Sequence, residues 1–322
     1  MKAIVYTHYG APEVVELQDV PKPAPKANEV LIRVRATTVT SGDWRARSLN
    51  LPKGFGLLGR FMFGIARPRQ SILGTELSGQ IESIGKLVTK YNVGDEVIAF
   101  TGAKMGCHAE YRCLPEDGLI AFKPQNLTHE EAASLLFGGT SALDFFRRGT
   151  IAKGDKILIN GASGSVGTAA VQLAKHFGAE VSGVCSTANV DLVRSLGADN
   201  VIDYTKHDFT QNGETYDIIM DTAGTAGFSR SKASLKDGGR LLLVLSPLSE
   251  VLGAIWRPRR VIAGPASVRA EDVREVARLA TSGALKPVID RTYPLTEAVA
   301  AHRLVDSGHK KGSVVLSVQG GA

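Results

Sequence analysis

The stretch Ile157-Leu158-Ile159-Asn160-Gly161-Ala162-Ser163-Gly164-Ser165-Val166-Gly167 decides the fold of this 322-residue chain. A β-rich apolar run is followed by small residues and then by the amphipathic segment 168–174, which predicts a strand, a tight turn and a helix. The turn has G-x-G-x-x-G spacing, with Ala162 at the first glycine position. Gly164 would let backbone approach a pyrophosphate, and Gly167 would let the helix pack against the strand.

This loop is therefore predicted to bind a dinucleotide, because the helix N-terminus behind it adds free N–H groups and a positive dipole end. Its predicted cofactor-binding residues are Ala162, Ser163, Gly164, Ser165, Val166 and Gly167. The predicted strands around it are Lys156–Asn160, Glu180–Cys185, Asn200–Ile202, Tyr216–Asp221 and Arg240–Leu245, and predicted helices cover about 166–177 and 190–196. Such alternation indicates a Rossmann, doubly wound parallel sheet of the α/β class.

The chain before this region has a different pattern of residues. Short β-rich segments separated by Gly, Pro and Asn predict a barrel-like β domain over residues 1–122. Its clearest strands are Ala3–Tyr6, Glu29–Ala36, Gly79–Ile84 and Glu96–Phe100. After Lys123-Pro124, Thr128 and Glu131 form a capping box for a helix. Near the C-terminus, β-rich segments again flank a predicted helix at about 296–306. We therefore expect residues 287–322 to complete the first domain and residues 123–286 to form the second.

The amino-acid composition limits the kinds of molecule that the chain is expected to bind. The formal net charge is +6 and the pI about 9.2, but no run of five Lys/Arg appears, so an anionic cofactor explains the charge better than nucleic acid. The three cysteines show no framework or metal spacing and predict reduced thiols in a cytoplasmic protein. We expect no signal peptide and no transmembrane segment, since no apolar stretch approaches the ~20 residues that one needs.

The residues after the second Rossmann strand favour NADPH over NADH. NAD sites usually carry an acid there for the ribose 2′-hydroxyl, whereas this chain has Ser186 and Thr187, whose hydroxyls could donate to a 2′-phosphate. The same two residues could also cap the helix that begins near Val190, and both interpretations can hold together. Asp191, the nearest acid, is expected in the first turn of that helix.

Ordered motifs along nearly the whole chain resemble the medium-chain dehydrogenase/reductase superfamily, specifically its zinc-lacking quinone oxidoreductase branch. They are Gly10–Val14, Gly74–Gly79, Val93–Val97, Ala109–Tyr111, Ala132-Ala133, the loop 161–167, Leu196–Asp199 and Gly312–Val315. The resemblance implies a GroES-like substrate domain made from both chain ends, a Rossmann domain between them, and an active site in the cleft. It also implies a homodimer through the edge of the Rossmann sheet.

The departures from the zinc-dependent relatives predict a site without metal. Thr75 stands where they carry a ligand histidine, and the other ligand positions fall near Thr40-Ser41 and Phe137-Gly138. A catalytic zinc needs three protein ligands, and none of those expected is present. Cys107, His108 and Cys113 have no usual ligand spacing, and local packing explains them better.

The resemblance also supplies candidate site residues. The substrate-facing stretch matches residues 38–47, although many relatives carry Asn at the position of Thr40 and often Tyr near Arg45. The candidate catalytic residues are Thr40, Ser41, Asp43, Trp44 and Thr140, with Thr140 beside the nicotinamide. The alternative is that Asp43 pairs with Arg45 or Arg47 and that Trp44 belongs to the core. Further candidate cofactor residues are Tyr204, Asp221, Ala223, Lys311, Gly312 and Ser313, although Ser313 stands where a lysine is frequent, and Lys310 and Lys311 could be surface charge.

The combined interpretation is a zinc-independent, NADPH-dependent reductase of a quinone or an α,β-unsaturated carbonyl. Without a Lewis acid, alcohol oxidation is disfavoured, whereas a conjugated acceptor is already polarised. The alternatives are another metal-free reductase, such as an enoyl-thioester reductase, and an NADPH-binding redox sensor or interaction protein without turnover. Two insert-like loops, 51–70 and 248–260, combine apolar and basic residues. They could form a cleft entrance and touch anionic membranes, or simply pack on the protein with their arginines in water.

Overall fold

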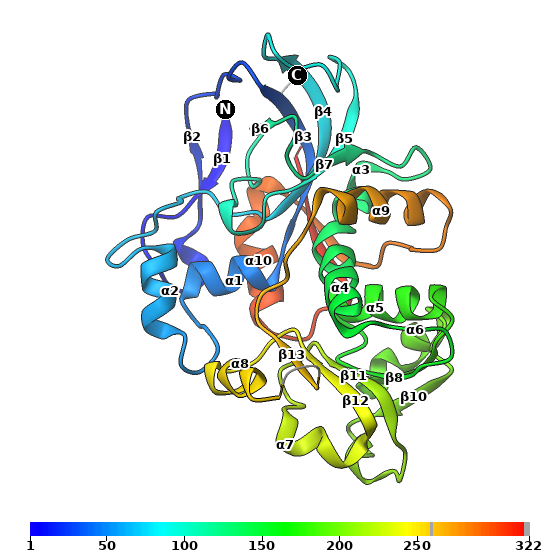
Figure 1. Cartoon of the computed structure of the whole chain (residues 1–322). Helices are drawn as coiled ribbons and strands as arrows, with labels where there is room; N and C mark the ends of the chain where they lie inside the picture. Colours follow the sequence, from blue (N-terminus) through cyan, green and yellow to red (C-terminus); the bar gives the residue numbers. More distant parts are fainter. Residues whose placement is uncertain (258–259, 319–322) are drawn as a thin grey trace.

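A computed structural model describes residues 1–257 and 260–318 of the chain. Two large sheets occupy opposite halves of the molecule, with helices packed between and around them (Figure 1). One sheet has seven strands and the other has six, and a separate two-stranded ribbon is formed by β1 (Lys2–Val5) and β2 (Glu16–Asp19). This architecture confirms the expected α/β class, with a Rossmann sheet and a second, GroES-like sheet.

The six-stranded sheet is entirely parallel, with the order β10-β9-β8-β11-β12-β13. Its strands are β8 (Lys156–Asn160), β9 (Glu180–Cys185), β10 (Asn200–Asp203), β11 (Tyr216–Asp221), β12 (Leu235–Leu243) and β13 (Val261–Ala263). Their continuous apolar runs are buried on both faces, as a parallel sheet covered by helices requires. The strand order reverses between β8 and β11, and ligands bind such sheets at this point, beyond the carboxyl ends of the strands.

Helices cover both faces of this sheet. The helices that pack on its strands are α4 (Leu136–Gly149), α5 (Ser165–His176), α6 (Val190–Ser195), α7 (Phe228–Ser231) and α8 (Leu248–Ile255), whereas α9 (Ala270–Thr281) packs on α4 and on β7 of the other sheet. Thr128 and Glu131 cap α3 (His129–Ala133) reciprocally, as predicted. The last predicted strand, Arg240–Leu245, was misplaced: β12 begins earlier, at Leu235, and ends at Leu243, because its Gly238-Gly239 pair is accommodated inside the strand.

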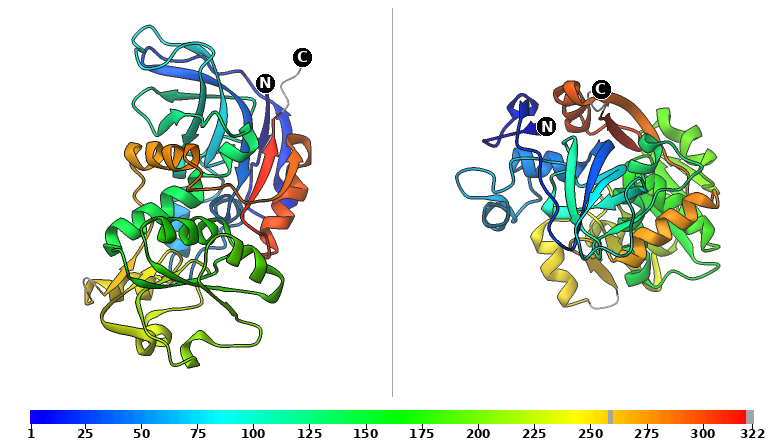
Figure 2. Two further views of the ribbon diagram at one scale, coloured as in Figure 1. Left: turned by 90° about the vertical axis from the view of Figure 1, so that its right-hand side faces the viewer. Right: turned by 90° about the horizontal axis from the view of Figure 1, so that it is seen from above.

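The seven-stranded sheet is built from both ends of the described chain. Its strands are β3 (Glu29–Val39), β4 (Glu76–Ile84), β5 (Glu96–Phe100), β6 (Tyr111–Pro115), β7 (Ile120–Phe122), β14 (Ile289–Pro294) and β15 (Ser313–Ser317). β15 runs antiparallel to β3, with Val314 opposite Val39. Figure 2 shows this C-terminal strand and α10 (Ala298–Asp306) beside the N-terminal strands.

The two insert-like loops predicted from the sequence each contain a helix. Segment 51–70 follows α1 (Ser41–Ser48) and contains α2 (Gly56–Phe63), and segment 248–260 contains α8. Their glycines and prolines indicated loops, but the Leu, Met and Arg residues between them are good helix formers. Arg259, part of the second segment, lies outside the described residues. No helix in the described chain is long and apolar enough to cross a membrane.

An ion pair with a fully buried arginine joins α1 to α10. The Arg47 side chain has no exposed surface, and its Nη2 donates to both carboxylate oxygens of Asp306 at 2.5–2.6 Å. Its Nη1 donates to the carbonyl of Gly10 at 2.6 Å. Because Gly10, Arg47 and Asp306 lie in three distant parts of the sequence, these bonds connect the N-terminal loop, the first helix and the last helix.

Two histidines lie against each other inside the same half of the molecule. His302 of α10 is fully buried, and its ring is 5.8 Å from that of His108, edge to face. Among the described residues, neither ring nitrogen of His302 has a hydrogen-bond partner. Burial, with smaller contributions from His108 and Arg47, lowers the pKa of His302 well below its ordinary value.

His302 should therefore make the fold acid-sensitive. The unfolded chain binds a proton at this histidine below its ordinary pKa of about 6.5, while the folded chain stays neutral, so stability falls as the pH drops below that value. One pH unit lower, the loss is about 1 kcal/mol. We expect His302→Met to flatten the change in urea midpoint between pH 7.5 and 5.5, roughly the two sides of that pKa.

The exposed His309 provides the matched control, since His309→Gln should leave the wild-type pH dependence in place. Identical pH dependence in wild type and His302→Met would show that His302 is not the group responsible.

Candidate active site

The glycine-rich loop between β8 and α5 is fixed to the neighbouring strand. The N–H groups of Gly161 and Ala162 both donate to the carbonyl of Val184 in β9, at 3.1 and 2.9 Å. Gly161 has a φ of +82°, a conformation that favours glycine, and a side chain there would meet Thr222. The loop leads directly into α5, whose first N–H groups have no intrahelical acceptor.

Gly164 and Gly167 have different roles in this loop. A Cβ at Gly167 would lie 2.1 Å from the carbonyl oxygen of Gly161, so Gly167 is required for packing of α5 on the loop. A Cβ at Gly164 would find only one atom within 4 Å, at 3.6 Å, so the protein itself leaves space there. Open space in front of a helix N-terminus is the cradle that a pyrophosphate needs, and the residues present fit a dinucleotide.

The C-terminal candidates lie directly on this loop. The N–H of Gly312 donates to the carbonyl of Ser163 at 2.8 Å, and the hydroxyl oxygens of Ser313 and Ser165 are 3.1 Å apart. Gly312 also forms an isolated parallel bridge with Gly164. Lys311 is exposed, and its backbone N–H donates to Asp290. The structure thus brings Gly312 and Ser313 to the dinucleotide loop and turns the Lys311 side chain to the surface.

At the end of the site predicted to bind the adenosine, only one of the two candidate hydroxyls, those of Ser186 and Thr187, is left to donate to a phosphate. Thr187 donates its hydroxyl to the carboxylate of Asp203 at 2.5 Å, and the bonds from Thr187 and Thr205 lower the pKa of Asp203 to about 2. The expected capping of the following helix by Ser186 and Thr187 side chains is not formed. Ser186 instead accepts from Asn189 at 3.1 Å and keeps its own proton free to donate.

Two further residues belong to this end of the site. The Tyr204 side chain is 60% exposed beside the end of β9, to which its backbone N–H is bonded. Asn189 donates to both Ser163 and Ser186 and so connects the dinucleotide loop with the β9 end. Sequence reasoning missed Asn189 and Asp203, because it searched the turn only for an acid at the usual NAD position. Asp191 lies in the first turn of α6, as expected.

Asp221 organises the opposite side of the crevice. Its carboxylate accepts from the backbone N–H groups of residues 223, 224 and 226 and from the Asn160 side chain, at 2.7–3.1 Å. It is buried and acts on the loop after β11 rather than presenting its oxygens to solvent. Ala223 is exposed, and a Cβ at Gly161 would come within 3.1 Å of it. The Asp221 loop therefore lies beside the dinucleotide loop, with Ala223 exposed between them.

Asp43 holds together the wall that the seven-stranded sheet contributes. One carboxylate oxygen accepts from the backbone and hydroxyl of Thr40 at 2.8 and 2.6 Å, and the other accepts from Gly74 N–H at 2.7 Å. The alternative pairing of Asp43 with Arg45 or Arg47 is wrong, since Arg45 donates to the Asn50 carbonyl and Arg47 pairs with Asp306. Asp43 is fully buried and positions the start of α1.

Glu76 is the second buried acid of this wall. It accepts from the Thr38 hydroxyl and from Phe137 N–H, each at 2.5 Å, and has no exposed surface. Burial raises the pKa of Glu76 to about 8, while nearby Lys310 opposes this shift. Burial also lowers the pKa of Lys310 to about 8, and Glu76 opposes that shift in turn. The Lys310 side chain is partly buried and its amine donates to the Gly312 carbonyl, a placement that sequence reasoning could not distinguish from surface charge.

The remaining candidates have mixed exposure. Thr140 is fully buried, and its hydroxyl donates to the carbonyl of Leu136 within α4. Trp44 is half-buried against the core of this half, with the Arg45 guanidinium 4.7 Å from the ring centre. Ser41 is half-buried at the first position of α1, where its N–H has no intrahelical acceptor. Their roles toward a substrate stay predictions.

The positions that correspond to zinc ligands do meet in space. The Thr40 and Thr75 hydroxyl oxygens are 3.5 Å apart, and a Cβ at Gly42 would contact the Phe137 ring at 3.6 Å and Thr75 at 3.8 Å. Threonine hydroxyls and a phenyl ring are not the thiolate and imidazole ligands that zinc prefers. No group of three or more His, Cys, Asp or Glu residues in the described chain could hold a metal ion. The residues at this point do not fit a zinc site.

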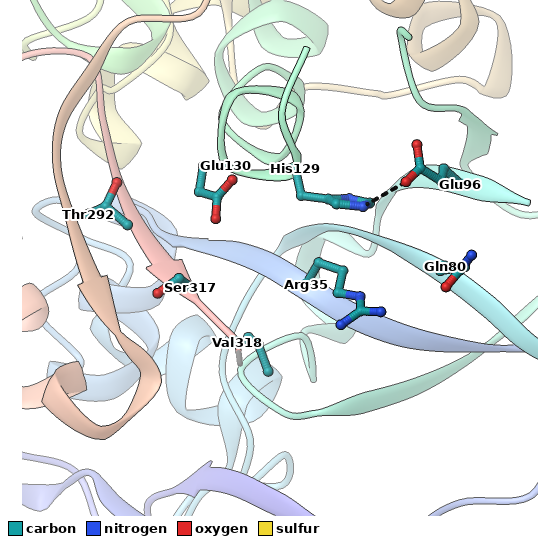
Figure 3. A pocket seen from close by; sticks show the side chains of 8 residues that line it. All are labelled: Arg35, Gln80, Glu96, His129, Glu130, Thr292, Ser317 and Val318. Atoms are coloured by element: carbon teal, nitrogen blue, oxygen red, sulfur yellow. Dashed lines mark hydrogen bonds and ion pairs between the residues drawn. The ribbon is translucent and has the colours of Figure 1, made fainter. Parts of the chain in front are cut away.

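One pocket of the described chain lies away from these residues. It has a volume of about 530 Å³ and is lined by residues of β3, β4, β5, α3, β14 and β15 (Figure 3). His129 lies between Glu96, 3.2 Å from Nε2, and the Ser78 hydroxyl, 2.8 Å from Nδ1. Ser78 is fully buried, so this chain of contacts presents no nucleophile. None of the lining residues belongs to the dinucleotide loop or the α1 N-terminus, and we do not assign the active site there.

Comparisons with known proteins identify the family of the chain. Residues 26–124 match the family model described as alcohol dehydrogenase GroES-like domain, and residues 196–316 match the one described as zinc-binding dehydrogenase. The chain is 32% identical to the 2-methylene-furan-3-one reductase of Solanum lycopersicum, over 98% of this chain and 79% of the relative. It is 30% identical, with the same coverage, to the chloroplastic NADPH-dependent alkenal/one oxidoreductase of Arabidopsis thaliana.

A solved structure extends the agreement to the whole fold. The quinone oxidoreductase from Coxiella burnetii superposes with a TM-score of 0.89 at 30% identity, covering 99% of both chains. The match therefore extends over both large sheets of the fold. The chain belongs to the medium-chain dehydrogenase/reductase superfamily, in its quinone oxidoreductase branch.

Proposed function

We propose that this oxidoreductase uses NADPH to reduce a quinone or an α,β-unsaturated carbonyl compound without the help of zinc. The observation that carries the proposal is the meeting of Thr40, Thr75 and Phe137 at the zinc-ligand positions, opposite an intact dinucleotide cradle. The names of the relatives, which include an alkenal/one oxidoreductase and quinone oxidoreductases, support the same acceptor class.

NADPH, when bound, supplies a hydride. The chain's own contribution begins with Gly164 and the α5 N-terminus, which would receive the pyrophosphate, and with Ser186 and Tyr204, which would receive the 2′-phosphate. Thr187 contributes indirectly, because its hydroxyl bond to Asp203 fixes the end of β9 against β10. Ala223 would line the crevice beside the loop.

On the acceptor side, the chain offers hydrogen-bond donors. Asp43 holds Thr40 as the N-cap of α1, and the free N–H groups of Ser41 and Gly42 then carry the positive end of the helix dipole. The Thr75 hydroxyl lies beside them. Such donors stabilise the negative oxygen that forms when a conjugated carbonyl accepts hydride, which is the function that a metal has in alcohol dehydrogenation. Trp44 would contribute apolar surface.

The test is an acceptor panel followed at the NADPH absorbance band. We expect NADPH oxidation with benzoquinones or short alkenals and enones, slower oxidation of NADH, and no loss of rate after exhaustive chelation. Stoichiometric zinc together with interconversion of simple alcohols and aldehydes would overturn the proposal. Tight NADPH binding without turnover of any acceptor would favour the sensor alternative, and turnover of enoyl thioesters alone would favour the other metal-free reductase.

Two further features belong to the same proposal. We infer a cytoplasmic location and a homodimer, as the family resemblance implies. The Rossmann sheet ends in β10 on one edge and β13 on the other, and either edge offers free backbone groups for such a contact.

A further inference from the structure

The start of α8, in one half of the molecule, contacts the turn that precedes α2, in the other half. The N–H of Leu248, at the start of α8, donates to the Lys53 carbonyl at 2.9 Å. A Cβ at Gly54 would lie 2.7 Å from the Leu248 Cβ. Both helices appear at the same corner of the molecule in Figure 1. We call the exposed side chains of the described parts of 51–70 and 248–260 the apolar–basic face.

This face holds most of the exposed apolar bulk of the protein. Of the thirteen large hydrophobic side chains that the described chain exposes, eight lie here, and Trp256 is the most exposed of all, at 86%. The eight are Leu57, Leu58, Phe61, Met62, Ile65, Leu252, Ile255 and Trp256. α8 buries none of its residues, and α2 buries only Gly59. Exposed apolar side chains gathered on two adjoining segments in this way indicate an interaction site.

The charge of the face is as concentrated as its apolar area. Segment 51–70 has four basic residues and no acid, and segment 248–260 has three basic residues and one glutamate, Glu250. The combined formal charge of the two segments, counting Arg259 outside the described residues, is +6 and equals the formal net charge of the whole chain. Lys53, Arg60, Arg67, Arg69, Arg257 and Arg260 are all exposed, and none of them forms an ion pair within the described residues.

We propose that the apolar–basic face docks on an anionic lipid bilayer. Exposed Leu, Phe, Ile and Trp side chains next to unpaired arginines are the composition of helices that lie in the membrane interface, where the apolar groups enter the acyl boundary and the cations meet lipid phosphates. A second copy of the chain would bring an equally positive surface to the same place, so charge complementarity selects the lipid phosphate.

The face lies close to the edge of the cleft. α8 begins soon after the carboxyl end of β12, on the side of the sheet where the dinucleotide loop lies, and segment 51–70 follows α1, whose N-cap is Thr40. Docking would therefore hold the opening between the two halves against the bilayer. The docking itself does not rest on the proposed reaction, since vesicle binding can be measured without cofactor or acceptor.

The experiment uses the full chain with phosphatidylcholine vesicles that contain or lack phosphatidylglycerol. We expect co-sedimentation with the anionic vesicles at low salt, at least about tenfold tighter than with the neutral ones, and release at high salt. Because the chain has only two tryptophans, a blue shift and quenching by bromine-labelled lipid that disappear in Trp256→Phe would place Trp256 in the bilayer.

Matched variants distinguish docking through the apolar–basic face from non-specific binding to vesicles. Trp256→Glu and Phe61→Glu should each weaken anionic-vesicle binding about tenfold or more, while Leu87→Glu, at an exposed apolar residue outside the face, should not. Trp256→Glu should keep the wild-type rate on a water-soluble enone. Equal binding to neutral and anionic vesicles, or equal binding by all variants, would overturn the proposal. Self-association abolished by Trp256→Glu without any vesicle binding would overturn it in favour of a contact between copies.

Discussion

Gly164→Ala should lose NADPH binding while the cofactor-free protein keeps its melting temperature. The added methyl would meet only one protein atom, at 3.6 Å, and the backbone φ of Gly164 is −79°, which alanine adopts readily. The methyl would instead occupy the space through which a pyrophosphate approaches the α5 N-terminus. We expect Kd to rise about 100-fold or more, which corresponds to ~2.7 kcal/mol.

The neighbouring glycine gives the contrasting control. In Gly167→Ala the new Cβ would lie 2.1 Å from the Gly161 carbonyl oxygen and 2.8 Å from backbone atoms of Ala162. Overpacking of this kind costs roughly 1–3 kcal/mol, so this variant should melt at a lower temperature even without cofactor. Thermal shift with and without NADPH, together with fluorescence titration, distinguishes the two. Wild-type NADPH affinity in Gly164→Ala would show that the cofactor does not use this loop.

Arg47→Ala should cause a large loss of folding stability. Arg47 is fully buried, and its removal leaves the Asp306 carboxylate and the Gly10 carbonyl without their partner. Breaking a buried pair on one side costs about 3–5 kcal/mol. Urea unfolding should show this loss as a lower midpoint, with separation of α10 from α1.

A surface pair on the same helix provides the comparison. Arg303 and Glu13 are 2.7 Å apart, but both side chains are more than half exposed, so Arg303→Ala should change the midpoint little. If Arg47→Ala fails to fold, the double variant Arg47→Met/Asp306→Leu should still fold, because it removes both charges together. Equal midpoints for Arg47→Ala and Arg303→Ala would contradict the role assigned to burial.

The Rossmann half could be predicted from sequence because its signals are local. The apolar run 156–160, the small-residue turn and the amphipathic helix follow one another, and the structure places β8 and α5 within one residue of the predicted ends. The capping box at Thr128 is similarly local. The predicted domain limits at 122/123 and 286/287 stay predictions.

The site could be predicted only in part, because it depends on contacts between distant residues. Thr40, Thr75 and Phe137 meet although 35 and 62 residues separate them in turn, and only the family resemblance indicated that they would. The sequence Lys310-Lys311 alone does not show which of the two amines is partly buried. The hydrogen bond between Gly312 and the dinucleotide loop fixes the backbone here and so determines it. Asp203 lies near the predicted cofactor residues only because β10 pairs with β9, and the sequence did not show this pairing.

The pairing of β15 with β3 has a consequence for how the chain is made. Val39 leaves the ribosome long before Val314, its partner across the strands, has been translated. The central Rossmann segment carries all six strands of its sheet in one continuous stretch and can fold as soon as it emerges. The N-terminal strands, in contrast, must wait with an open edge, so we expect the last steps of biogenesis to be slow and to expose this edge to chaperones.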